Sequence, residues 1–364
     1  MSTIESQTTQ KALLEYKWQA AGVVTIGLFL SMLDNTIVSV ALPAMRQDLN
    51  TTFQTITWVA TAYFLAQAAV IPITGYLSDR QGTKAVFVSA LAIFLVGSIL
   101  CAAATSKEML IFARVVQGIG GGALMPTSFA IAYKAFPRDE WGRATSAIGV
   151  PVLLAPVLGP VIGGLLTSEF GWRAIFAINL PIAGAGVVLA LLVLRNRSSE
   201  LGAAAPVESR FDLIGFGLCV LSFTTLIYGL TEAGLQGWTD PGVDRIFVGG
   251  AVLLALLVWT EWVTPNPVLD FRLFLIGPFA RANILLWLVA ASFYGTLFLI
   301  PYFFENVIGT SALSAGEILI GQGVAAAISI AVAGELYNKV GPRALVGVGT
   351  ACLAAGTIGF TQLS

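Results

Sequence analysis

The stretch "SMLDNTIVSVALP" (residues 31–43) places a carboxylate, Asp34, inside a run that is otherwise mostly apolar from Ala21 to Pro43. An aspartate at the centre of a membrane-spanning helix costs about 2.5 to 3.5 kcal/mol on translocon scales. Ionisable residues at such a depth usually face a cavity or pair with a partner. The stretch therefore predicts both a membrane helix and a functional use for Asp34.

The composition assigns the chain to a class before any motif is considered. Hydrophobic residues make up 57% and charged residues 11% of it, against roughly 45 to 50% and 25% in soluble domains. The net charge of −1 gives no reason to expect a nucleic-acid partner. Histidine is absent, and Cys101, Cys219 and Cys352 are far apart in apolar segments, so no disulfide framework or zinc site is indicated. These features predict a membrane protein without metal or cofactor.

Eleven stretches of the chain reach the roughly 20 mostly apolar residues that a spanning helix requires. With the N-terminus inside, the inner segments hold 14 Lys and Arg residues and the outer segments hold 4. This bias predicts an inner-membrane protein with a cytoplasmic N-terminus. The expected spans are 20–43, 54–77, 85–104, 108–133, 143–167, 174–194, 212–232, 246–263, 282–304, 314–335 and 343–361.

An internal repeat predicts the domain organisation. "GYLSDRQGTKAV" (75–86) recurs loosely as "GELYNKVGPRAL" (334–345), eight helices later instead of the six that a plain duplication gives. The polar segment "RNRSSELGAAAPVESRFD" (195–212) reads as a linker. We therefore expect a six-helix bundle over 1–194, a cytoplasmic linker over 195–211, an inserted helix pair over 212–263 and an incomplete C-terminal bundle over 264–364.

Five ordered motifs give the chain a family resemblance. They are "LDNTIVSVALP" (33–43), "GYLSDRQGTK" (75–84), "RVVQGIGGG" (114–122), "GPVIGG" (159–164) and "WRAIFAINLPIAG" (172–184). With them the chain resembles the major facilitator superfamily, and within it the fourteen-helix drug:proton antiporter branch of EmrB/QacA type. Thr83 departs from the pattern, since a second basic residue is usual there. The resemblance implies an all-α polytopic membrane protein in which about 11 of 14 expected helices are present, either as a fragment or as a naturally short chain.

Asp34 and Arg114 are the candidates for proton coupling. A rise of about 1.5 Å per residue puts Asp34 roughly 13 Å and Arg114 about 9 Å below the outer surface, so the two charges lie at similar depth. Pairing would offset part of the burial cost of each, and protonating Asp34 would release Arg114. A purely structural ion pair is the alternative. On the helix of Arg114, a polar and small stripe predicts a cavity wall or, alternatively, close helix packing; its members are Gln117, Gly118, Gly121 and Met125.

Two further groups owe their proposed roles to the resemblance. The 75–84 loop would latch the inner gate, although positive-inside topology alone explains Lys84 equally well; its residues are Gly75, Asp79, Arg80, Gly82 and Lys84. The helix over 143–167 would carry the antiporter motif, and generic packing explains its glycines alone about as well; the motif residues are Pro156, Gly159, Pro160, Gly163 and Gly164. Asn179 and Pro181 are interpreted as structural.

The expected function is export of amphiphilic or cationic compounds in exchange for protons, by alternating access and with the proton gradient as energy source. The alternatives are a proton-coupled importer of the same fold and a non-transporting, truncated regulator or sensor. An enzyme is not expected, because no nucleophile, base and orienting group cluster on any span. The resemblance adds a periplasmic adaptor as a candidate partner, on the strength of "ELGAAAPVESRFDLIGFGL" and "PVLDFRLF".

Overall fold

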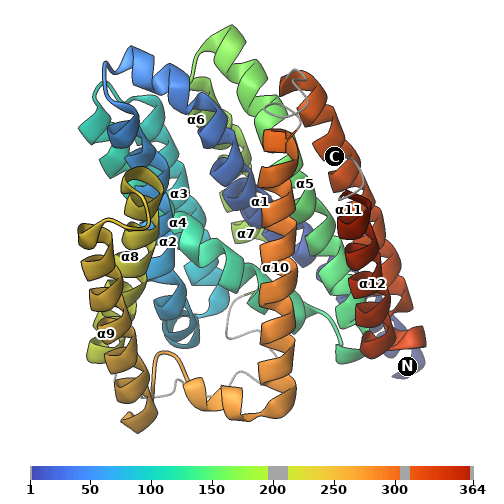
Figure 1. Cartoon of the computed structure of the whole chain (residues 1–364). Coiled ribbons are helices and arrows are strands. Elements are labelled where there is room, and N and C mark those ends of the chain that lie inside the picture. Colours follow the sequence, from blue (N-terminus) through green and yellow to red (C-terminus); the bar gives the residue numbers. More distant parts are fainter. Residues whose placement is uncertain (1, 196–211, 304–311, 361–364) are drawn as a thin grey trace.

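The computed structural model describes residues 2–195, 212–303 and 312–360, and all regular secondary structure in these ranges is helical (Figure 1). Side-chain caps begin several of the helices: Ser106 accepts a hydrogen bond from the Met109 N–H (3.2 Å), and Asp240 accepts one from the Gly242 N–H (2.7 Å). The α-helices are α1 (Ser2–Asp48), α2 (Phe53–Gln81), α3 (Thr83–Ala102), α4 (Lys107–Ala135), α5 (Trp141–Phe170), α6 (Ala174–Ala177), α7 (Asn179–Val193), α8 (Leu213–Gln236), α9 (Pro241–Val263), α10 (Gly277–Phe303), α11 (Ala312–Val340) and α12 (Pro342–Phe360), with short 3-10 helices η1 (Arg138–Glu140) and η3 (Phe271–Leu275).

Each of the eleven expected spans corresponds to helix in the structure. The sixth span is divided by a turn at Ile178 into α6 and α7, and α1 begins at Ser2, well before the expected start. Within the described residues, eight helical segments are long and apolar enough to cross a membrane, and Gly277–Phe293 is a shorter apolar helix. The eight are Tyr16–Asp48, Phe53–Gln81, Thr83–Ala102, Lys107–Ala135, Arg138–Phe170, Ala174–Val193, Leu213–Gln236 and Pro241–Val263.

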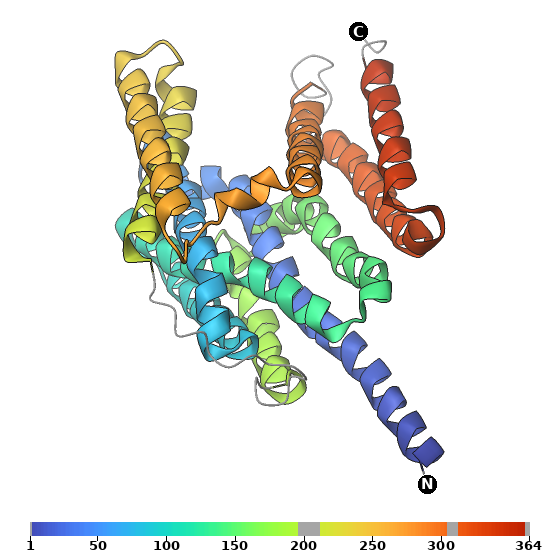
Figure 2. The same ribbon diagram turned by 90° about the horizontal axis from the view of Figure 1, so that it is seen from below.

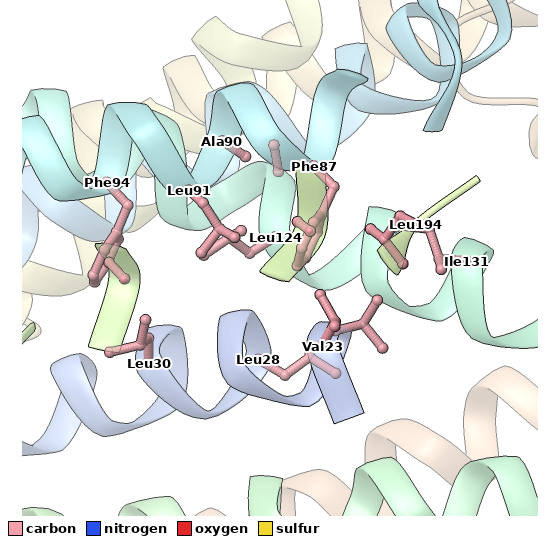
Figure 3. Packing of buried hydrophobic residues seen from close by; sticks show 14 of the residues in the cluster. Val23, Leu28, Leu30, Phe87, Ala90, Leu91, Phe94, Leu124, Ile131 and Leu194 are labelled. Carbon is pink, nitrogen blue, oxygen red and sulfur yellow. The ribbon is translucent and has the colours of Figure 1, made fainter. Parts of the chain in front are cut away.

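The first seven α-helices form a bundle with two apolar clusters. In the larger one, side chains of α1, α3 and α4 interdigitate around Phe87, Leu91 and Phe94, and Leu194 closes one side (Figure 3). The smaller cluster lies toward the Asp48 end of α1 and includes Ile37, Met45, Leu110 and Phe176. On α1 the larger cluster ends at Leu30 and the smaller begins at Ile37. The segment that contains Asp34 therefore lies between the two apolar clusters.

The remaining helices flank this bundle on opposite sides (Figures 1 and 2). The hairpin of α8 and α9 packs against α2, where the rings of Trp58 and Tyr228 lie 5.7 Å apart. On the other side, α11 packs against α5, and Ser146 Oγ donates a hydrogen bond to the Ile330 carbonyl (2.9 Å). Helices α10 and α12 each contact α11. The chain thus passes from one side of the bundle to the other between α9 and α10.

Candidate functional site

A buried polar cluster forms where α1, α3, α4 and α7 meet between the two apolar layers. Asp34 projects from α1, Ser98 from α3 and Asn179 from the start of α7, while Arg114 and Gln117 lie on α4. Arg114 and Gln117 are three residues apart and so share one face of their helix. None of the five residues is more than 1% exposed. We call this set the Asp34 cluster.

The ion pair expected between Asp34 and Arg114 is present. Arg114 Nη1 donates to Asp34 Oδ2 (2.5 Å) and to Gln117 Oε1 (2.6 Å). Its Nε–H donates to the Val59 carbonyl of α2 (3.0 Å). An arginine with several directed donors is held in one orientation. The guanidinium is therefore fixed by α1, α2 and α4 together.

The second carboxylate oxygen of Asp34 is also satisfied. Oδ1 accepts hydrogen bonds from Gln117 Nε2 (2.9 Å) and Asn179 Nδ2 (3.3 Å). Gln117 Nε2 donates in addition to Ser98 Oγ (2.9 Å). Both carboxylate oxygens of Asp34 thus face N–H donors, from the Arg114 guanidinium and from the Gln117 and Asn179 amides. The structure thus presents Asp34 in surroundings built for a negative charge.

Aromatic rings cover the guanidinium of Arg114. The ring centroid of Tyr63 lies 3.9 Å and that of Phe176 5.8 Å from Arg114 Cζ. A cation over an aromatic face at this range is stabilised by about 0.5 to 2 kcal/mol, more when desolvated. The Tyr63 hydroxyl accepts a hydrogen bond from Gln67 Nε2 (2.9 Å), which also donates to Ser31 Oγ (3.2 Å). A second polar layer therefore adjoins the Asp34 cluster.

This arrangement suits a chemical role based on one proton. Breaking a buried pair by neutralising one partner leaves the other charge uncompensated. Protonating Asp34 would remove the counter-charge of Arg114, while the Gln117 and Val59 contacts remain. The described residues include no group of three or more His, Cys, Asp or Glu that could hold a metal ion.

The predicted stripe on α4 divides between three roles. Gln117 belongs to the Asp34 cluster, and Met125 is 39% exposed. A Cβ added at Gly118 would lie 2.5 Å from the Tyr63 carbonyl oxygen, and one at Gly121 would lie 2.5 Å from the Tyr63 hydroxyl. Gly118 and Gly121 therefore pack closely against α2, as the packing alternative expects. Cavity lining by the stripe stays a prediction.

The glycine and proline motif of α5 lies against α1 next to Asp34. A Cβ at Gly159 would overlap Thr36 Oγ1, and a Cβ at Gly163 would lie 2.9 Å from the Ile37 carbonyl oxygen. Gly164 has open space around it. Pro156 is buried and Pro160 is half-buried. The motif thus lets the backbone of α5 pack closely against the turn of α1 that follows Asp34. Its role in antiport stays a prediction.

The residues of the predicted gating loop lie at the end of α2 and the start of α3. Gly82 has a φ of +88° and joins the two helices. Arg80 Nη1 donates to the Tyr76 hydroxyl (2.8 Å), and Asp79 is also engaged in an interaction.

Lys84 Nζ donates to the carbonyls of Leu191 (2.8 Å) and Leu194 (2.6 Å), which end α7. Lys84 therefore stabilises a helix C-terminus, and the latch role of this loop stays a prediction. Gly75 has open space around it.

Sequence reasoning missed part of the site. Ser98 and Tyr63 were not predicted, and Asn179 was assigned only a structural role, although it contacts Asp34 directly. Ser98 and Asn179 are polar residues within otherwise apolar spans, which was the available signal. The backbone carbonyl of Val59 has no signal in the sequence at all.

Comparisons with known proteins agree with this architecture. The family model described as Major Facilitator Superfamily matches residues 24–364. The "Multidrug resistance protein B homolog" of Mycobacterium tuberculosis is 35% identical over 341 residues, which cover 93% of this chain and 62% of the relative. The "Methylenomycin A resistance protein" of Bacillus subtilis is 30% identical, with 92% of this chain and 71% of the relative covered. The "Uncharacterized MFS-type transporter YhcA" of Bacillus subtilis is 29% identical over 94% of this chain and 63% of its own length.

The chain thus spans less than two thirds of the length of some of these relatives. Solved structures share its fold at low sequence identity. The human organic anion transporter MFSD10 superposes with a TM-score of 0.60 at 18% identity, covering 90% of this chain and 73% of the other. The proton:xylose symporter XylE of E. coli superposes with a TM-score of 0.59 at 14% identity, covering 90% and 70%. From the family match, the relatives and the helical architecture together, this chain belongs to the Major Facilitator Superfamily of multi-pass membrane transporters, not to a family of enzymes.

Proposed function

We propose that the chain is the core of a proton-coupled exporter of amphiphilic or cationic compounds. The observation that carries the proposal is the fully buried pair of Asp34 and Arg114, whose polar partners come from α2, α3, α4 and α7. The printed names of two relatives, a multidrug resistance protein and a methylenomycin resistance protein, support drug-like compounds as substrates. The sequence motifs support the fourteen-helix antiporter branch.

In the proposed mechanism, Asp34 is the proton-responsive carboxylate and Arg114 is its charge partner. When Asp34 binds a proton, Arg114 loses its counter-charge and the attraction between α1 and α4 weakens. Because the other hydrogen bonds of the cluster join α2, α3 and α7 to the same point, one proton shifts the packing preference of five helices. A proton can change a conformational equilibrium only through such a difference in binding free energy between the two states.

The placement in the membrane and the domain organisation form part of the proposal. The excess of Lys and Arg on one side supports a cytoplasmic N-terminus in an inner membrane. The position of the α8–α9 hairpin, apart from α10–α12 on the other side of the bundle, supports an inserted helix pair over 212–263 (Figure 2). The linker prediction over 195–211 lies outside the described residues apart from Arg195. The periplasmic adaptor rests on the sequence resemblance alone.

Import is the second candidate function. The structural neighbours include a proton:xylose symporter as well as an organic anion transporter, so the fold is common to different transport modes. The glycine and proline motif of α5 favours export by resemblance. The two directions differ in what a substrate does to the proton: in an antiporter the two compete, and in a symporter they bind together.

The experiment is to add a lipophilic cation to the purified, reconstituted protein in weak buffer and to record proton release. We expect release from the native chain and none from Asp34→Asn. Asp48→Asn is the matched control, because Asp48 is an exposed acid on the same helix that pairs with Arg173 (2.8 Å); it should release protons normally. Equal release from Asp34→Asn, or proton uptake by the folded native chain, would contradict the proposal.

A further inference from the structure

A second pair of carboxylates lies in the α8–α9 hairpin, away from the Asp34 cluster. Asp212 caps the N-terminus of α8, where its Oδ1 accepts a hydrogen bond from the Gly215 N–H (2.8 Å). Glu261 lies near the end of α9 and is 0% exposed, and its Oε2 accepts a hydrogen bond from the Leu269 N–H (3.0 Å). The Val268 N–H also acts on the Glu261 carboxylate, so both carboxylates interact with the backbone.

The other oxygens of the two carboxylates lie close to the same point. A Cβ added at Gly215 would overlap both Asp212 Oδ2 and Glu261 Oε1. Both oxygens are buried, and neither accepts a hydrogen bond from any described residue. Two ionised carboxylates in this position would repel each other without a donor between them.

The charged groups among the described residues do not relieve this repulsion. Asp270, at the start of η3, acts on Glu261 as a further negative charge, and the Cys219 thiol also lies within electrostatic range of Glu261. The nearest cation on the same segment, Arg272, directs its Nη2 to the carbonyls of Trp262 (2.5 Å) and Thr264 (3.2 Å). No group of three or more ligands suited to a metal ion occurs in the part of the chain that the structure describes.

We propose that Asp212 and Glu261 form a second proton-binding site, in which one proton is shared between Asp212 Oδ2 and Glu261 Oε1. A carboxyl group is a donor when protonated, so one proton satisfies both orphan oxygens and removes one of the two charges. The site is independent of the proton-coupled export proposed above.

The location of this site gives it a structural consequence. Asp212 is where the chain enters α8, and Leu269 belongs to the segment that leads from α9 to α10. The shared proton therefore links the segment that enters α8 to the segment that leaves α9. Loss of the proton would leave two like charges at one point and weaken this link, so the two ends of the hairpin are held together more firmly at low pH than at high pH.

The test is the pH dependence of thermal unfolding of the purified chain in detergent. A proton bound in the folded state and lost at higher pH stabilises the protein only at low pH. Between about pH 5 and about pH 8, we expect the Tm of the native chain to fall by about 2 to 4 °C more than the Tm of Glu261→Gln. The amide that Glu261→Gln introduces donates to Asp212 at every pH. Asp212→Asn retains a good N-cap and should show the same loss of pH dependence.

Glu232→Gln is the matched control. Glu232 is also buried in this hairpin, at 5% exposure, but it accepts a hydrogen bond from the Gln236 side chain. This variant should keep the native pH dependence. Infrared spectroscopy gives a second readout: the absorption of a protonated carboxyl should disappear from the native chain as the pH rises and be missing from Glu261→Gln.

Two results would overturn the proposal. One is a pH dependence and carboxyl absorption in Glu261→Gln and Asp212→Asn that match the native chain. The other is stabilisation of the native chain, but not of Glu261→Gln, by Na⁺ or Ca²⁺ at constant pH, which would make the ligand a metal cation.

Discussion

At the residue scale, the buried polar groups of the bundle are arranged around one carboxylate, that of Asp34. Its two oxygens accept hydrogen bonds from Arg114, Gln117 and Asn179, and it lies between two apolar layers that exclude water. Low local polarity strengthens these bonds and raises the cost of leaving any one unmade. Substitutions in the Asp34 cluster should therefore be strongly coupled to each other.

A double-mutant cycle measures this coupling. Arg114→Gln leaves Asp34 buried without its counter-charge and should reduce the free energy of unfolding by about 3 to 5 kcal/mol. The combination with Asp34→Asn should cost less than the sum of the single changes, with a coupling of about 0.5 to 3 kcal/mol. Thermal unfolding in detergent gives the values. The exposed pair of Asp48 and Arg173 is the reference and should show at most about 1 kcal/mol of coupling; additive effects at the buried pair would contradict the expectation.

At the element scale, small residues fix how closely the helices approach. Gly118 and Gly121 of α4 face α2, and Gly159 and Gly163 of α5 face α1. Within lipid, the hydrophobic effect does not drive helices to associate. Close backbone packing and interhelical hydrogen bonds therefore hold such helices together. Glycines on one face of α5 can therefore control the position of the turn that follows Asp34.

A pair of alanine substitutions in α5 tests this control. Gly159→Ala adds a methyl group that overlaps Thr36 Oγ1, so α5 must move away from α1, at a cost of about 1 to 3 kcal/mol. Gly164→Ala is the matched control: its methyl group meets open space, and the better helix propensity of alanine should leave stability unchanged or raise it by up to about 1 kcal/mol. Unfolding temperature and lipophilic-cation transport are the measurements. Equal effects of the two substitutions would show that close packing at Gly159 is unimportant.

At the scale of the whole molecule, α5 joins the bundle to the C-terminal helices. One part of α5 packs on α1, and another part packs on α11 from Gly142 and Ser146 to Val157. The partner residues on α11 descend from Gly334 to Gly323 over the same stretch, so the two helices run antiparallel. Alternating access requires such an interface to open and close.

A reversible cross-link tests whether this interface must move. Ser146→Cys with Gly334→Cys brings together two positions whose Cβ atoms would lie 2.9 Å apart, which a small shift brings into the disulfide range of about 3.5 to 4.5 Å. With Cys352, an exposed cysteine, changed to Ser, oxidation should abolish lipophilic-cation transport and a thiol reductant should restore it. Ser146→Cys alone should be insensitive to oxidation. Full transport by the cross-linked protein would mean that α5 and α11 stay in contact throughout the cycle.

Sequence patterns alone located the helices and the central charge pair. A membrane span must satisfy its own backbone hydrogen bonds, so each span is a long local run of apolar residues, and such runs are visible without any tertiary information. The similar depth of Asp34 and Arg114 followed from the rise per residue. For Gly118 and Gly121 the sequence left two roles open, because small residues suit a cavity wall and a helix contact equally well.

Only the tertiary structure decided which groups surround each charge. Asn179 meets Asp34 and the Val59 carbonyl meets Arg114 from two further helices, and Ser98 meets Gln117 from a third. Asp212 and Glu261 both approach Gly215. Helices that are apolar on all sides carry no polar face to indicate their rotation, and the register between helices distant in sequence depends on how their side chains and glycines interlock. The sequence by itself therefore determined where the spans and buried charges are, while packing determined what those charges touch.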